Sequence, residues 1–579
     1  MRLPKLRELQ ASRQMVDTFR GYNHNLRISD GEFFDMKNMT SDYYPVLSPR
    51  KKRGVYTSPE SPKGMIAKDA LCYVDGSNFV INEYPVDMGL NDEPKQLISM
   101  GAYVIIMPDK KWINTLDVTE FGDIEASFTS TSDVTFSLCT VDGADYENMT
   151  VSADEPEEPE NMALWIDTSS KPHTLKQYSA TSSMWVQIAT TYIKISCPGI
   201  GAAFEQYDGV TISGIVSEDL QDLNASVVIW AKGDDYIVVV GLLDNVTEQT
   251  AEEGEITVVR EMPELDFITE SENRLWGCRY GVANNGEVVN EIYASKLGDF
   301  KNWSCYMGLA TDSYTASCGT DGQFTGAITH MGYPLFFKEN CVHKVYGNYP
   351  ANFQIQTTAC RGVQKGCERS LAIVNEVLYY KARNGICAYD GSLPTEASYA
   401  LGNEAYSEAV GGGHGNKYYV TMKDVTGNWN LFVYDTAKGM WHKEDDLHAE
   451  SFCSCRNELY AISNGDIITM LGSGDDYEGD LEWMVQTGEI GISSPDMKYI
   501  SRLTVRMSMD IGSEVRFYAQ YDFSEAWEEL FTLRSDNLRS FSLPIRPKRC
   551  DHMKIRIEGV GMAKIYSITK TIEQGSELS

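Results

Sequence analysis

The sequence lacks the long apolar runs that a membrane-spanning helix requires. Its longest apolar runs are Val227–Ala231 and Tyr236–Leu243, whereas a spanning helix needs about 20 consecutive apolar residues. The first residues, MRLPKLRELQASRQ, are basic but carry no apolar segment of the kind found in a secretory signal. We therefore expect no membrane span and synthesis in a cytosol.

Catalytic motifs are also missing. The 579 residues include only eight histidines and contain no HExxH, phosphate-binding P-loop, GxSxG or dinucleotide-binding GxGxxG pattern. His343 and His442 lie in apolar strands or beside a tryptophan and are expected in the core or at its rim. The carboxylates of Asp424, Asp435 and Gly472–Asp480 are expected in solvated turns. We predict no catalytic, cofactor or metal site, although paired carboxylates far apart in the chain leave a polysaccharide hydrolase as an alternative.

Thirteen cysteines occur at irregular spacings, and their odd number argues against a disulfide framework. In a chain without a secretory signal, this pattern predicts reduced and mostly buried thiols. Cys453 and Cys455 are the nearest approach to a metal-binding motif, with His448 close by. A zinc site needs four ligands at workable spacing, so we predict that these cysteines lie in strands of the core or at a sheet edge.

Positive charge is scarce, and the negative charge is unevenly distributed. The net charge is −33, and residues 117–259 contain 26 acidic but only 4 basic residues. That segment cannot bind nucleic acid, because phosphate recognition needs cationic side chains. The one dense basic cluster comprises Arg50, Lys51, Lys52 and Arg53. We predict that it is an interface with a neighbouring subunit, DNA or an acidic partner, and the alternative is a solvated turn before a strand.

Strand patterns dominate what is present. A hairpin of two alternating strands joined by a turn recurs seven times. The seven copies are Leu71–Tyr84, Tyr103–Thr115, Leu275–Phe300, Leu335–Gly347, Leu378–Gly391, Tyr418–Asp445 and Leu459–Leu471. The last four begin 43, 40 and 41 residues apart. A period of about 40–50 residues in an all-β chain predicts a β-propeller of about seven blades, with six to eight possible. An antiparallel sandwich with coincidental spacing is the alternative.

The repeat is interrupted once, by the acidic segment, and it ends near residue 475. The predicted organisation is an N-terminal arm with the first strands (1–60), a first propeller segment (61–116), an acidic inserted β-rich domain (117–260), a second propeller segment (261–475) and a C-terminal β-sandwich (476–579). In the insertion, VTFSLCTV, YIKISC, VSEDLQDLNASVVIWA and DDYIVVVGLL are predicted strands. In the C-terminal domain, Tyr499, Leu503, Val505, Met507 and Met509 share one predicted face. The best candidate helix is Lys5–Phe19.

Three regions resemble one family of known proteins. They are Phe19–Gly54 (with DGEFFDMKN and PVLSPR), the central stretch from ENRLWGCRYG (272–281) to KVYG (344–347), and RSFSLPIRPKRCDHMKIRIEG (539–559). These segments are similar to the nozzle or hub ("stabilization") proteins of short-tailed bacteriophages. The resemblance covers most of the chain except the acidic insertion.

The resemblance implies a structural virion protein, assembled in the cytoplasm of a bacterial host. It implies a homo-oligomeric ring, a hexamer, that docks on the portal or its adaptor and on other tail proteins, anchors appendages such as tail fibres, and continues the DNA exit channel. No active site is carried over. An acidic channel would repel the DNA backbone and let the duplex slide through without sequence-specific binding. The alternative is a receptor-binding propeller that recognises host-surface glycan, with Trp303 and Trp441 as candidate platforms.

Overall fold

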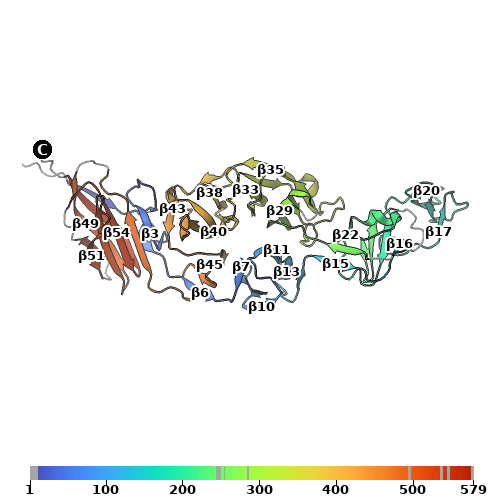
Figure 1. The fold of residues 1–579 in the computed structure, drawn as a ribbon, viewed down its shortest axis with the longest axis horizontal. Coiled ribbons are helices and arrows are strands. Elements are labelled where there is room, and N and C mark those ends of the chain that lie inside the picture. Colours follow the sequence, from blue (N-terminus) through green and yellow to red (C-terminus); the bar gives the residue numbers. More distant parts are fainter. Residues whose placement is uncertain are drawn as a thin grey trace, which may run out of the picture. The chain divides into compact units, whose positions relative to one another are not determined.

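The computed structural model of the chain is built almost wholly of strands (Figure 1). It describes residues 11–242, 250–252, 255–282, 286–492, 497–534, 539–543 and 548–574. Within these ranges the only helices are short 3₁₀ segments: η1 (Glu218–Leu223), η2 (Pro350–Asn352), η3 (Glu368–Ser370) and η4 (Tyr399–Leu401). The predicted all-β class is therefore confirmed. Among the described residues, no helix is long and apolar enough to cross a membrane.

The chain divides into two compact units. The first contains residues 1–95, 337–342 and 358–579, and the second contains residues 96–336 and 343–357. Each unit is described separately below.

Each of the seven predicted hairpins supplies central strands of a small antiparallel sheet. In the first unit these sheets are β7 (Pro62–Ala67), β8 (Leu71–Asp75), β9 (Asn78–Ile81) and β10 (Tyr84–Asp87); β36 (Ala372–Val374), β37 (Val377–Ala382), β38 (Gly385–Tyr389) and β39 (Thr395–Glu396); β40 (Tyr406–His414), β41 (Lys417–Asp424), β42 (Trp429–Asp435) and β43 (Met440–Lys443); and β44 (Ser451–Cys455), β45 (Glu458–Ser463) and β46 (Asp466–Thr469). The last of these sheets is extended by strands from outside its repeat, β6 (Gly54–Thr57) and β47 (Asp475–Asp476). A segment near the N-terminus thus completes a sheet that otherwise forms some 400 residues later.

Three more sheets of this kind lie wholly or largely in the second unit. They are β11 (Gln96–Met100), β12 (Tyr103–Met107), β13 (Lys111–Asn114) and β14 (Phe121–Asp123); β28 (Phe267–Ser271), β29 (Arg274–Val282), β30 (Val288–Ala294) and β31 (Tyr314–Ser317); and β32 (Gly326–His330), β33 (Tyr333–Lys338), β34 (Cys341–Tyr346) and β35 (Gln354–Ala359). In each sheet, consecutive strands are neighbours. This is the arrangement that alternating sequence and short turns specify locally.

The largest sheet lies in the first unit and has ten strands in the order β40-β41-β42-β43-β2-β3-β48-β54-β50-β51. Its further strands are β2 (Gly21–Tyr22), β3 (Glu32–Lys37), β48 (Glu482–Thr487), β54 (Met553–Val560), β50 (Glu514–Tyr521) and β51 (Glu528–Leu533). Strand β2 joins β43 through the pair Tyr22 and Trp441, and β3 runs antiparallel to β48. The N-terminal strands therefore connect the β40–β43 sheet to the C-terminal strands by continuous backbone pairing.

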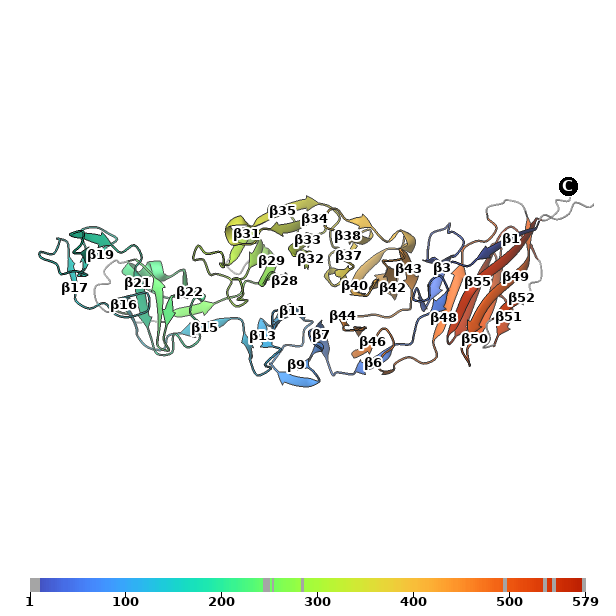
Figure 2. The ribbon, with the colours of Figure 1, turned by 180° about the vertical axis from the view of Figure 1, so that it is seen from behind.

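A second C-terminal sheet has the order β1-β55-β49-β52, with β53 also paired to β49 (Figure 2). Its strands are β1 (Ala11–Val16), β55 (Ala563–Gln574), β49 (Lys498–Met509), β52 (Arg539–Leu543) and β53 (Arg549–Cys550). The predicted alternation of buried and exposed side chains is confirmed for Leu503 and the alternate residues that follow it. It is wrong for Tyr499, because a register shift between Ile500 and Arg502 turns Ile500 into the core instead.

The helix predicted over Lys5–Phe19 is wrong where the structure describes it. Residues 11–16 form β1, which pairs antiparallel with β55 from Ala11 opposite Glu573 to Val16 opposite Ile568. Residues 5–10 lie outside the described part of the chain. Pairing with a distant strand outweighs a weak local helical preference.

The acidic segment forms three sheets with their own apolar core. They are β15 (Ala126–Thr129), β27 (Thr257–Arg260), β22 (Gly209–Ser213) and β23 (Ser226–Val228); β24 (Ala231–Lys232), β25 (Tyr236–Val240), β21 (Tyr192–Ser196), β16 (Val134–Cys139) and β26 (Thr250–Glu252); and β17 (Met149–Ser152), β18 (Leu164–Asp167), β19 (Thr174–Ser179) and β20 (Met184–Gln187). Their buried residues, which include Phe136, Ile193 and Val258, pack in one cluster. One predicted strand is partly wrong: Glu218–Leu223 is the helix η1, whose three-residue repeat places both Leu220 and Leu223 in that core.

Candidate functional site

The predicted interface residues Arg50, Lys51, Lys52 and Arg53 connect β5 (Ser48–Pro49), which pairs with β4 (Met39–Thr40), to β6. Their burial separates them into two classes. The side chains of Arg50 and Arg53 are only 5% and 2% exposed, whereas Lys51 is exposed and Lys52 is half-buried. Neither arginine is a surface residue, so the interface prediction now concerns the two lysines.

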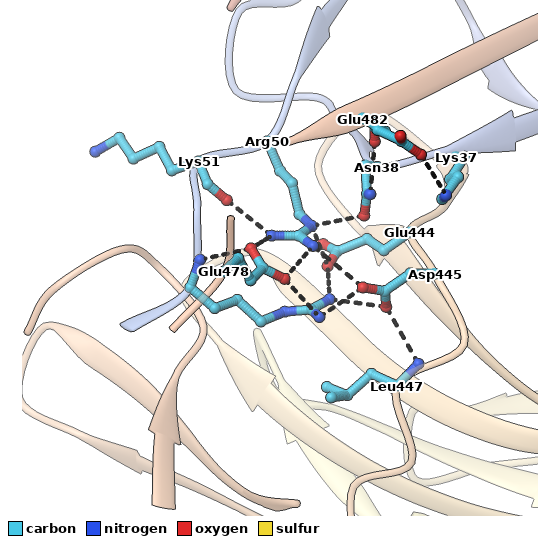
Figure 3. A network of polar contacts seen from close by, with 10 residues as sticks. Lys37, Asn38, Arg50, Lys51, Glu444, Asp445, Leu447, Glu478 and Glu482 are labelled. Atoms are coloured by element: carbon cyan, nitrogen blue, oxygen red, sulfur yellow. Dashed lines mark hydrogen bonds and ion pairs between the residues drawn. The ribbon is translucent and has the colours of Figure 1, made fainter. Parts of the chain in front are cut away.

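Arg50 is held by a set of carboxylates from distant parts of the first unit (Figure 3). It donates hydrogen bonds of 2.7 Å to each carboxylate oxygen of Glu478 and one of 3.1 Å to Asp445. Its Nε donates to the side-chain oxygen of Asn38 at 2.9 Å and lies 3.3 Å from Glu444. Such two-pronged arginine–carboxylate contacts are strong and fix orientation.

Arg53 binds the same three carboxylates. It donates to both oxygens of Asp445 at 2.7 and 3.0 Å, to Glu444 at 2.7 Å and to Glu478 at 3.3 Å. Its backbone N–H donates to Glu478 at 2.9 Å. Of the side-chain nitrogens and oxygens that the structure describes in these residues, only its Nε is buried without a partner.

These five charged residues, which we call the arginine–carboxylate cluster, comprise two cations and three anions. Burial on its own lowers the pKa of Arg53, but the carboxylates of Asp445 and Glu444 raise it by more, so the pKa of Arg53 lies above its usual value. Burial likewise raises the pKa values of Asp445 and Glu478, but Arg53 and Arg50 lower both below the usual range. Arg53, Asp445 and Glu478 are therefore charged near neutral pH, and the cluster ties the N-terminal segment to the loops after β43 and β47.

Sequence reasoning missed the carboxylate half of the cluster. Glu478 lies in Gly472–Asp480, where the sequence predicts solvated turns, and Glu444 and Asp445 follow the histidine and lysine of β43. The only available signal is the excess of positive charge at Arg50–Arg53 within a strongly acidic chain. Its partners could not be chosen among 83 acidic residues.

A cavity of about 390 Å³ lies next to the cluster, and Arg50 and Glu444 contribute to its wall. Three lysines line it, Lys51, Lys417 and Lys438, and the last two are each paired with an aspartate. Lys417 donates to Asp42 at 2.5 Å, and Lys438 donates to Asp435 at 2.9 Å. Asp435 is itself buried, which corrects its assignment to a solvated turn. The carboxylates of Asp42, Asp435 and Glu444 in the lining offset three of the four positive charges of Arg50 and the lysines, which leaves the cavity without a concentrated positive charge for an anion.

The two tryptophans considered as glycan platforms are buried. Trp303 and Trp441 are each 2% exposed. Their indole N–H groups donate to the backbone carbonyls of Phe300 at 3.0 Å and Ala397 at 2.8 Å. Both therefore contribute to packing, and neither offers a face to a sugar ring.

The remaining candidate residues also have structural surroundings. His343 is buried between the hydroxyls of Thr320 and Thr357 at 2.9 and 2.8 Å, and burial lowers the pKa of His442 to about 3, which keeps it neutral. Cys453 and Cys455 are buried. His448, instead of joining them, stacks on Trp429 with ring centroids 3.9 Å apart. In the part of the chain that the structure describes, no group of three or more His, Cys, Asp or Glu residues could hold a metal ion.

No family profile and no curated protein matches the chain. Among solved structures, the acylaminoacyl peptidase of Pyrococcus horikoshii is 10% identical with a TM-score of 0.24, covering 54% of this chain and 55% of that one. The chain thus spans about half the length of that peptidase. PorZ, a surface component of the type-IX secretion system of Porphyromonas gingivalis, is 12% identical over 88% of this chain and 77% of that one, with a TM-score of 0.26. The Trypanosoma rangeli sialidase is 8% identical over 97% and 96%, with a TM-score of 0.20. Similarities at this level define neither a family nor an activity.

Proposed function

We propose that this chain is a structural component of a bacteriophage tail, a nozzle or hub protein that assembles into a ring below the portal and its adaptor. In this proposal the ring is a hexamer, continues the DNA exit channel and anchors tail appendages. The seven small sheets would be the blades of a propeller. The sheet of β44, β45, β46 and β6 would join the two ends of the repeat. The protein would act mechanically and not as an enzyme.

The observation that carries the proposal is the ten-stranded sheet of the first unit. In it, β2 and β3 fuse the β40–β43 sheet to the C-terminal strands, and β1 pairs along the last strand, β55. The arginine–carboxylate cluster adds ion pairs that hold the same N-terminal segment through the buried side chains of Arg50 and Arg53. A component that transmits load benefits from such cross-connections, because no strand at either end can move without breaking a ladder of backbone hydrogen bonds.

The charge distribution is compatible with a conduit. A net charge of −33 per chain, multiplied by the number of subunits in the ring, would repel a DNA backbone and favour passage over binding. The buried state of Arg50 and Arg53 supports this role, because it removes two of the four clustered cations from contact with DNA.

The alternative of a host-glycan-binding propeller keeps no support from Trp303 and Trp441, which are buried. The experiment that separates the two functions is the mass of the purified protein in solution, together with negative-stain images of the same sample. A ring of about six subunits with an axial hole as wide as a DNA duplex supports the conduit. A monomer that stays monomeric when mixed with portal and adaptor proteins contradicts it.

A further inference from the structure

A second cavity, in the second unit, combines a buried cation with aromatic walls. It measures about 280 Å³ and lies beside the β28–β29 turn. The residues that matter among its lining are Arg274, Trp276, Phe353, Tyr333, Asn348 and Glu272. Small-molecule sites have this character: a concave, mostly apolar wall with a few polar groups that converge on the ligand.

Arg274 is 2% exposed and has an unusual set of partners. It donates to three backbone carbonyls, those of Ser295 at 2.8 Å, Asp312 at 2.6 Å and Ala310 at 2.8 Å. No carboxylate among the described residues lies within ion-pair distance of it. Burial lowers the pKa of Arg274, and the more distant Asp312 opposes this only in part. A guanidinium has five N–H donors, so two remain for a ligand.

The walls beside Arg274 are suited to a ring with apolar faces. Phe353 is half-buried, and Arg274 lies over its ring, 5.6 Å from the centroid. Trp276 is only 3% exposed and packs edge to face against Phe353 at 4.9 Å, so it supports the wall without offering a face of its own. Tyr333 is 37% exposed and lies at the rim. Asn348 accepts a bond from Asn352 through its side-chain oxygen, which leaves its amide N–H₂ as a donor.

We propose that this cavity binds an acidic saccharide, with the sugar carboxylate on Arg274 and the sugar ring against the aromatic wall. A planar carboxylate matches the two free donors of a guanidinium, and the apolar face of a pyranose matches an aromatic ring. Asn348 would donate to a sugar hydroxyl. A sugar that bears a carboxylate also fits better than inorganic phosphate, because phosphate has no apolar face to place against the aromatic wall. This site does not depend on the proposed role in a tail.

Glu272 makes the proposal testable without disturbing the fold. It is exposed, at a turn position with a φ of 51°, and its side chain has no hydrogen-bond or ion-pair partner among the described residues. Removing its charge should tighten the binding of an anion. It should leave a neutral ligand unaffected and weaken the binding of a cation.

The experiment is a calorimetric titration of the full chain with oligoglucuronate, with a neutral oligoglucoside, acetate and inorganic phosphate as separate arms. We expect oligoglucuronate to bind and the neutral sugar, acetate and phosphate to bind at least about tenfold more weakly, which corresponds to about 1.4 kcal/mol. Glu272→Gln should tighten oligoglucuronate binding by about threefold, and Asn348→Ala should weaken it by a similar factor.

Arg274→Gln should abolish binding, but it also removes three bonds to the 295–312 loop. Its result therefore counts only if its unfolding temperature stays close to that of the parent chain. Equal binding of the neutral sugar, tighter binding of phosphate or acetate, weaker binding by Glu272→Gln, or no binding by the folded parent chain would each overturn the proposal.

Discussion

Arg50 donates hydrogen bonds of 2.7 Å to each carboxylate oxygen of Glu478, which lies 428 residues further along the chain. This contact closes a loop that contains most of the sequence. It also places Arg50 and Arg53 in one cluster with Glu444 and Asp445. The cluster has one more negative than positive charge, and this imbalance determines how single substitutions should act.

Loss of an arginine should cost more than loss of a carboxylate. Arg53→Met leaves one cation facing three anions, of which Glu444 is buried and Asp445 and Glu478 are 14% and 18% exposed, and we expect it to lower the free energy of unfolding by about 3–5 kcal/mol. Glu478→Gln leaves two cations and two anions, and we expect a loss of about 1–2 kcal/mol from weakened hydrogen bonds.

Lys52→Met is the matched control for this prediction. Lys52 pairs with Asp480 at 3.9 Å, and the side chains are 39% and 88% exposed, so water screens the pair and its loss should change the free energy of unfolding by less than about 0.5 kcal/mol. Urea unfolding at pH 7 measures all three variants. A larger loss for Glu478→Gln than for Arg53→Met would contradict the charge account.

The same cluster should make stability sensitive to acid. The pKa values of Asp445 and Glu478 are lowered in the folded protein, so the unfolded chain takes up protons first as the pH falls. Their contribution is then complete above about pH 5 and is lost as the pH falls through the folded-state pKa values. Glu478→Gln removes one of these groups and should flatten the decline. Urea unfolding between pH 7 and pH 3.5 tests this, and an unchanged slope in the variant would count against it.

The features that the sequence could predict are those set by near neighbours. The hairpin at Leu378–Gly391 alternates along its own strands, so its pairing, such as Leu378 with Tyr389, follows from local pattern and a short turn. The same holds for the alternation after Leu503 in β49.

The features that it could not predict depend on distant partners. Strand β1 forms because β55 offers it an edge to pair with, and β55 lies more than 540 residues away in sequence. The arginine–carboxylate cluster required the choice of three carboxylates among 83. The shifted face of Tyr499 depends on one irregularity in register, which alternation alone does not reveal.

The cysteines should be unreactive in the folded protein. None of the thirteen forms a disulfide, and all but Cys318 and Cys360 are buried. Burial raises the pKa of Cys453 to about 12 and that of Cys360 to about 11, so almost no thiolate is present at pH 8. We expect a thiol-specific disulfide reagent to label at most about two groups quickly in the native protein and all thirteen in denaturant. Rapid native labelling of Cys453, measured by peptide mass, would contradict the described packing.

The junction at β2 should be intolerant of any side chain at Gly21. This residue has a φ of 82°, and a Cβ there would lie 2.3 Å from the carbonyl oxygen of Trp441, its neighbour across the β2–β43 pairing. Gly21→Ala must therefore push β2 away from β43 and weaken the ten-stranded sheet at its narrowest point. Gly439 has a similar φ of 66° in the β42–β43 turn but no atom within 4 Å of a Cβ, so Gly439→Ala bears only the backbone cost of about 1 kcal/mol. We expect Gly21→Ala to lose about 2 kcal/mol more than Gly439→Ala in urea unfolding, with hydrogen exchange accelerated in β2 and β3. Equal losses in the two variants would mean that β2 does not bear on the stability of the sheet.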